Sequence, residues 1–279
     1  MQSTLTTPRV ARWLVISIAI ISILIITLWT AATPNHLHGK ADAVGYAVCH
    51  RIAERSFEAY GVQLPLCARC TGIYLGVMTG LFVYVASGRG RAMRLPPWKI
   101  AGVFAVFVGI LAIDGINSYL HLFPGFKHGL YEPNNTLRLT TGIYTGLAMI
   151  TLVLPIFNTT VWHRDDNRHV LENWRELAGL LLVATLVLIA TLTRRPIILL
   201  VFGLISAAGV VVVLTMINSV MVITIFRLER RYHNLQEMWW PLLSGAALTF
   251  ILIGAIDFLR FSITGTWDGF TFPTAYWSF

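Results

Sequence analysis

The chain has 279 residues, of which 56% are apolar and only 12% are charged, and its mean hydropathy is +0.69. This composition excludes an ordinary soluble domain, in which about a quarter of the residues are charged, and indicates a membrane protein. The net charge of +8 is expected to reflect loop residues that orient the protein, with no nucleic-acid partner.

Seven apolar segments approach the length of about 20 residues that a helix needs to cross a bilayer. The first, preceded by Arg9 and Arg12, exceeds the usual apolar core of a signal peptide, about 7–15 residues, so we expect an uncleaved anchor. The sixth is long enough to require tilt or a protruding end. The expected fold class is an all-α, polytopic membrane helix bundle of about seven transmembrane helices, at residues 13–32, 72–87, 100–123, 140–157, 177–192, 197–226 and 239–259.

Loop charges favour an inside N-terminus and an outside C-terminus for a multi-pass protein of the cell membrane. Twelve of the 21 Lys and Arg residues fall in the segments that this orientation makes cytoplasmic, as the positive-inside rule requires. Arg194 and Arg195, between spans five and six, oppose it. The unusual polar residues all fall on the outer side, and they stay together if the orientation is inverted.

A short motif, Thr-Gly-Ile-Tyr-x-Gly, occurs at residues 71–76 and again at 141–146. Glycines spaced four apart allow helices to approach closely in lipid. The two copies predict an internal repeat, in which spans three and four repeat the structure of spans one and two. We expect a motif-bearing core at 1–158, with an outer Cys/His loop at 33–70, and a C-terminal membrane region at 159–279.

The three cysteines lie within 22 residues of one another, as Cys49-His50 and Cys67-Ala68-Arg69-Cys70. Cys49, His50, Cys67 and Cys70 supply four donors, enough for a tetrahedral zinc site. Zinc is therefore the candidate cofactor, in a structural or a catalytic role. The alternative is a redox dithiol formed by Cys67 and Cys70.

An apolar stripe over residues 43–61 predicts a short helix that ends at Gly61. This helix would place Arg51 and Arg55 on one face. Neighbouring helical residues point about 100° apart, so Cys49 and His50 reach one ion only if the helix begins between them. The other candidates for the fourth donor are His36, His38, His121 and His128.

Ionisable residues within the spans form a second signal. Asp114 is expected roughly 12 Å inside the end of its span, where a charge marks a functional or paired residue. Its expected partner is Arg138, or Arg260 with Asp257, and an ion pair that only orients helices is the alternative. Surplus guanidinium groups suit an anionic lipid or phosphate ligand. We assign a catalytic role to Asp114, Asn134, Asn135 and Arg138, and ligand binding to Arg51, Arg55, Arg69, Arg138, Asp257 and Arg260.

Two blocks of the sequence resemble a prokaryotic membrane family known as domain of unknown function 2085. The first is Cys-His-Arg-Ile-Ala-Glu-Arg-Ser-Phe at 49–57, followed by Gln-Leu-Pro-Leu-Cys-Ala-Arg-Cys-Thr-Gly-Ile-Tyr-Leu-Gly at 63–76. The second comprises Asp114-Gly115, Asn-Asn-Thr-Leu-Arg at 134–138, and Thr141-Gly142. The resemblance covers about residues 45–150 and departs from the family at Ala53 and at 116–131. It implies a membrane location and one shared site, without an activity.

The preferred function is an integral membrane protein whose outward-facing metal site adjoins a pocket for an anionic, lipid-borne ligand. The first alternative is a membrane thiol-disulfide oxidoreductase that uses Cys67 and Cys70 with a quinone. The second is a non-enzymatic scaffold or subunit. No ATP-binding loop, Ser-His-Asp set or glycine-rich dinucleotide turn is visible in the sequence, so the sequence defines no reaction.

Overall fold

The computed structural model describes residues 12–121, 129–164 and 166–269. Seven helices in this part of the chain are long and apolar enough to cross a membrane, which confirms the predicted polytopic bundle. They are α1 (Arg12–Ala32), α3 (Ala68–Ala86), α4 (Trp98–Leu120), α5 (Asn135–Val161), α6 (Trp174–Leu192), α7 (Pro196–Ile225) and α8 (Trp239–Thr264). Between α1 and α3 lie α2 (Leu37–Val48), the 3₁₀ turn η1 (Ala53–Arg55), β1 (Ser56–Ala59) and β2 (Val62–Cys67).

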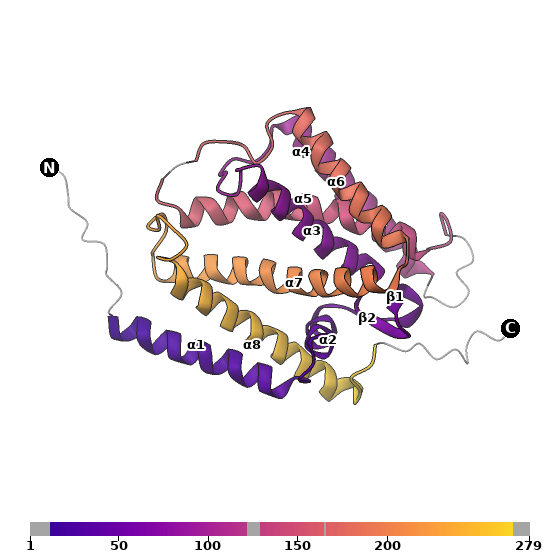
Figure 1. The fold of residues 1–279 in the computed structure, drawn as a ribbon, viewed down its shortest axis with the longest axis horizontal. Coiled ribbons are helices and arrows are strands. Elements are labelled where there is room, and N and C mark those ends of the chain that lie inside the picture. Colours follow the sequence, from indigo (N-terminus) through magenta and orange to yellow (C-terminus); the bar gives the residue numbers. More distant parts are fainter. Residues whose placement is uncertain (1–11, 122–128, 165, 270–279) are drawn as a thin grey trace.

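Helix α7 runs through the middle of the bundle (Figure 1). It contacts α3 and α5 as well as α8, and α1 packs against α8. Helix α4 packs on α5, whose Leu139 and Ile143 are completely buried. Large apolar side chains on the outside, such as Ile20 and Leu24 of α1, are exposed, as a lipid-facing surface requires.

The two copies of the glycine motif meet where α3 and α5 are in contact. A Cβ atom on Gly72 would lie 3.1 Å from the Cα of Gly142, and a Cβ on Gly142 would lie 3.1 Å from the Cα of Gly72. Further along α3, Gly80 faces the side chain of Ile150. The contacts advance in the same direction along both helices, so α3 and α5 are parallel. Glycine permits this close approach because it has no Cβ.

The helices that precede α3 and α5 have different packing partners. Helix α1 packs on α8, whereas α4 packs on α5. The internal similarity is therefore visible in the α3–α5 pair. A repeat that includes the preceding spans stays a prediction.

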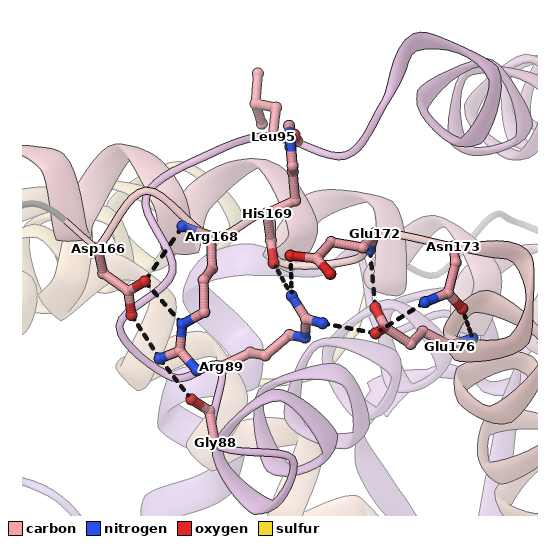
Figure 2. A network of polar contacts seen from close by, with 9 residues as sticks. All are labelled: Gly88, Arg89, Leu95, Asp166, Arg168, His169, Glu172, Asn173 and Glu176. Atoms are coloured by element: carbon pink, nitrogen blue, oxygen red, sulfur yellow. Dashed lines mark hydrogen bonds and ion pairs between the residues drawn. The ribbon is translucent and has the colours of Figure 1, made fainter.

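A polar network holds the end of the bundle where α3 finishes, opposite the end that carries Cys70 (Figure 2). Arg89, in the α3–α4 loop, forms ion pairs with Glu172 (3.2 Å) and Glu176 (2.6 Å) and donates to the backbone carbonyl of His169 (2.6 Å). These contacts place the α3–α4 and α5–α6 loops together. Both were predicted to be cytoplasmic, and the orientation itself stays a prediction.

The helix predicted for residues 43–61 is wrong after residue 48. Helix α2 ends before Cys49, and β1 and β2 then form an antiparallel hairpin in which Glu58 pairs with Gln63. Tyr60 and Gly61 make its two-residue turn, with positive φ angles of 55° and 74°, as in type I′ turns. The glycine therefore marks a hairpin turn and not the end of a helix.

Candidate metal centre and arginine cluster

The three cysteines come together where α2, β2 and α3 meet. Cys49 directly follows α2, Cys67 ends β2, and Cys70 lies in the first turn of α3. Their sulfur atoms lie within 4.8 Å of one another, and all three are free thiols. The backbone N–H of Cys67 donates to the Sγ of Cys49 (3.3 Å). We call these residues the cysteine group.

Close packing of α2 on the hairpin sets the position of Cys49. A Cβ atom on Gly45, one turn before Cys49, would lie only 1.9 Å from the carbonyl oxygen of Pro65. Glycine is therefore required at this point of contact. Because Pro65 is two residues before Cys67, the contact also fixes how closely the two cysteines approach.

Hydrogen bonds concentrate negative charge on Cys49. The thiols of Cys67 and Cys70 bond to its sulfur and hold the pKa of Cys49 well below its usual range, although burial opposes this. The hydrogen bond to Cys49 raises the pKa of Cys67 to about 12. Burial lowers the pKa of His50 and favours a neutral imidazole. A thiolate and a neutral imidazole are the forms that bind metals.

In the described part of the chain, the cysteine group offers three side chains that could bind a metal ion. No described histidine or carboxylate lies within the same 4.8 Å of all three sulfurs. The Nδ1 of His50 accepts a hydrogen bond from the N–H of Ile52 (3.1 Å), so His50 as a fourth ligand stays a prediction. Three of the other candidate donors lie outside the group, namely His36, His38 and His121. The fourth, His128, lies outside the described residues.

Asp114 of α4 is buried, with 1% of its surface exposed, and both of its carboxylate oxygens are bound. Its Oδ2 forms an ion pair with Arg69, and its Oδ1 accepts a hydrogen bond from the hydroxyl of Tyr131 (2.9 Å). The prediction that Asp114 pairs with Arg138 or Arg260 is therefore wrong. Arg69 takes this place because it lies in the first turn of α3 and reaches α4 from there.

Arg138, in the first turn of α5, is buried with 6% of its surface exposed. It donates to the Oδ1 of Asn135 (2.8 Å), and its Nε has no hydrogen-bond partner among the described residues. Asn135 donates to the carbonyl of Glu54 (3.1 Å) and so connects α5 to the segment before β1. Asn134 is the N-cap of α5. The two asparagines therefore position the helix end that carries Arg138.

Arg55, Arg69 and Arg138 form what we call the arginine cluster. Arg55 donates to the carbonyl of Ser118 (3.1 Å), and Arg69 donates to the hydroxyl of the same residue (3.1 Å). Burial and the neighbouring charge of Arg69 lower the pKa of Arg55. Arg138 lies within electrostatic reach of both arginines and of Asp114. Arg69 and Arg138 thus share the buried carboxylate of Asp114, and the carboxylate within reach of Arg55 is that of Glu54.

The arginine cluster borders the cysteine group. Arg55 and Arg138 both lie within electrostatic reach of Cys67. The imidazole of His50 is within reach of Cys49 and of all three arginines. The predicted metal ligands and the predicted anion-binding residues are therefore neighbours in space.

Other predicted ligand residues lie elsewhere. Arg51 pairs with Asp42 of α2 (2.8 Å), so the expectation that Arg51 and Arg55 share a helical face is wrong because α2 ends before both. Arg260 donates to backbone carbonyl oxygens at the end of α2. Asp257 lines a separate cavity.

Two residues of the site were missed from the sequence. Ser118 lies one helical turn after Asp114, and this spacing is a signal that would have indicated it. Tyr131 follows α4 in a loop, where the side chain of Asn117 accepts from the N–H of Leu130 (2.9 Å) and donates to the carbonyl of Tyr131 (2.9 Å). No sequence pattern points to such a loop contact.

Comparison with known proteins identifies the family. Residues 49–152 match the predicted membrane proteins of domain of unknown function 2085. An uncharacterised protein of Methanocaldococcus jannaschii is 31% identical over 124 residues, which are 44% of this chain and 71% of that protein. The chain belongs to this family. A second family relative, an uncharacterised protein of Methanothermobacter thermautotrophicus, is 37% identical over 109 residues, 38% of this chain and 86% of that protein.

The family match and the seven apolar helices together make this chain a multi-pass membrane protein. The matched residues contain the whole cysteine group, the arginine cluster and Asp114, whereas α6, α7 and α8 lie outside the match. No solved structure matches the chain.

Proposed function

We propose that the cysteine group holds a zinc ion and that the arginine cluster beside it binds the anionic group of a lipid-borne ligand. The observation that carries this proposal is the surplus of positive charge. Arg69 and Arg138 share one buried carboxylate, Asp114, and Arg55 adds a third guanidinium whose nearby carboxylate is the exposed Glu54. All three lie near the converging thiols.

The cysteine group fits zinc in its donors and in its spacing. Zn–S bonds near 2.3 Å in a tetrahedron separate the sulfurs by about 3.8 Å, and the three sulfurs lie within 4.8 Å of one another. Three protein ligands leave a fourth position, which His50 closes in a structural site and a water or substrate fills in a catalytic one. In the catalytic case, zinc supplies Lewis-acid chemistry at a bound oxygen.

The arginine cluster fits an anion. Asp114 already pairs with Arg69, and neither Arg55 nor Arg138 forms an ion pair with a described carboxylate. Buried guanidinium groups need a counter-charge, and their planar forks bind phosphate and carboxylate in a bidentate way. A phosphate or carboxylate between Arg55 and Arg138 would neutralise this surplus.

The surroundings of the cluster favour a ligand that comes from the bilayer. Arg69 and Arg138 lie at the ends of the spanning helices α3 and α5. On α4, close to Asp114, the apolar side chains of Ile113 and Ile116 are exposed. A lipid chain along this surface would bring its headgroup to the level of the arginines.

The thiol oxidoreductase is the second candidate, supported by two free thiols three residues apart at the start of a helix. A helix N-terminus favours thiolates in general, whereas here the hydrogen bond to Cys49 raises the pKa of Cys67 to about 12. In that reaction the sulfurs of Cys67 and Cys70 form one S–S bond, and two electrons and two protons pass to a quinone. A scaffold is the remaining alternative.

The test compares lipids retained by the purified full chain and its variants in an uncharged detergent, measured by native mass spectrometry. We expect wild-type protein to retain an anionic lipid that Arg138→Ala releases, with the zinc content unchanged. Arg55→Ala, in η1, should weaken retention in the same way. It provides an independent test if Arg138→Ala does not fold. Arg195→Ala, an exposed arginine before α7, is the matched control and should change nothing.

The same experiment distinguishes a lipid headgroup from free phosphate, and anion binding from the two alternative functions. Inorganic phosphate that displaces the lipid would show that the phosphate group alone is recognised. Equal lipid retention by wild-type protein, Arg138→Ala and Arg55→Ala would overturn the anion-binding proposal in favour of a scaffold. Formation of a disulfide between the thiols of Cys67 and Cys70 on addition of a quinone, with one quinol produced per disulfide, would support the oxidoreductase instead.

A further inference from the structure

A cavity of about 680 Å³ lies between α1, α2 and α8. It contains none of the residues of the arginine cluster or the cysteine group. Its volume falls in the range of small-molecule sites, about 300–1,000 Å³. The cavity is therefore large enough to hold a ligand of its own.

Aromatic rings form much of the cavity wall. The ring of Trp267 lies 5.1 Å from that of Tyr46 and is stacked on Phe261 at 4.7 Å. Trp29 and Phe258 also line the cavity. Aromatic faces carry negative electrostatic potential and attract cations within about 6 Å. The guanidinium of Arg260 already lies over the ring of Tyr46 (4.0 Å), so this ring is covered by a cation of the chain itself.

Among the residues that line the cavity, three carboxylates accompany one arginine and one histidine. Asp42 pairs with Arg51 (2.8 Å). Asp257 has 6% of its surface exposed, and its Oδ1 has no hydrogen-bond partner among the described residues. Arg260, one turn further along α8, donates to three backbone carbonyls at the end of α2 and lies within electrostatic reach of Asp257. Asp268 adds a third carboxylate to the lining.

We propose that this cavity binds an organic ammonium group, with Asp257 as the counter-charge and the rings of Trp29, Phe258 and Trp267 as walls. A buried carboxylate in a membrane protein is by default functional or paired, and an ammonium between aromatic faces satisfies both it and the rings. A metal ion is disfavoured because it needs several oxygen ligands where the walls offer rings. An anion is disfavoured by the carboxylates.

The test is binding of choline chloride to the purified full chain in an uncharged detergent, measured by calorimetry and by the fluorescence of the cavity tryptophans. The neutral isostere 3,3-dimethylbutan-1-ol has the same shape without the charge, so we expect it to bind at least about tenfold more weakly. Asp257→Asn should weaken choline binding by at least about tenfold and leave the alcohol unaffected. Trp267→Leu, at a more exposed position, should also weaken choline binding, and unchanged binding would contradict the aromatic wall.

Asp166→Asn, in the polar network at the opposite end of the bundle (Figure 2), is the control and should bind choline like the wild type. Equal binding of choline and the neutral alcohol, or unchanged binding in Asp257→Asn, would overturn the proposal. Nanodiscs identify the source of the ammonium group. If the ammonium group belongs to a lipid headgroup, discs made of choline lipids should block the binding of free choline, and discs made of glycerol lipids should not. If it belongs to a soluble cation, free choline should bind in both kinds of disc.

Discussion

Replacing Asp114 with alanine is expected to destabilise the protein strongly. Its carboxylate is almost completely buried, pairs with Arg69 and accepts a hydrogen bond from Tyr131. The substitution would leave a guanidinium that is only 20% exposed without its counter-charge. Removal of one partner from a buried ion pair costs about 3–5 kcal/mol, and this is the decrease that we expect in the free energy of unfolding.

The double substitution separates the ion pair from the packing around it. Arg69→Met alone leaves a buried carboxylate without its partner, whereas Asp114→Ala with Arg69→Met removes both charges. The loss in the double variant should therefore be smaller than the sum of the single losses, with a coupling energy of about 1–3 kcal/mol. The assay is equilibrium unfolding of the full chain in mixed micelles, titrated with a denaturing detergent and followed by tryptophan fluorescence.

Glu132→Ala is the matched control, because Glu132 is an exposed acid on the loop that carries Tyr131. Its effect should stay within about 0.5 kcal/mol, as for ordinary surface substitutions. A loss below about 1 kcal/mol for Asp114→Ala would refute the reasoning. So would single losses that simply add in the double variant.

Two further predictions concern the α3–α5 contact and the loop network. Gly146→Ala would place a methyl group 1.9 Å from the carbonyl of Ile73 and should cost about 1–3 kcal/mol in the same titration. Gly179→Ala, with open space around it, should be neutral or stabilising, and equal losses would contradict the packing. Arg89 lowers the pKa of Glu172, so this pair should stabilise the loops above pH of about 4 and weaken as the pH falls through the lowered pKa. The measurement is the protection of the amides of residues 88–95 from hydrogen exchange at a series of pH values. The same pH dependence of protection in the wild type and in Glu172→Gln would contradict the prediction.

Features encoded in local sequence were predictable. Apolar length alone indicates seven spans because the bilayer core requires a fixed length of helix. The glycine motif indicated close helix packing, and Gly72 and Gly142 do meet. The grouping of Cys49, Cys67 and Cys70 followed from their proximity in the chain and from the position of Cys67 and Cys70 at a helix start.

Features that depend on tertiary contacts were not predictable. The periodicity at 43–61 suits a helix, but α2 packs against the backbone of Pro65 and the chain turns into a hairpin. Arg138 was the expected partner for Asp114, but the side chain of Arg69, at the start of α3, reaches the carboxylate on α4. Tyr131 reaches the carboxylate from a loop, where no periodic pattern operates.

The claim that the cysteine group holds a metal is the centre of this account, and elemental analysis of the full chain, purified without chelators or added metal, tests it most directly. We predict about one zinc per chain, and loss of that zinc together with reduced stability in Cys67→Ser. Metal-free protein in which Cys67 and Cys70 are joined by a disulfide would contradict the account.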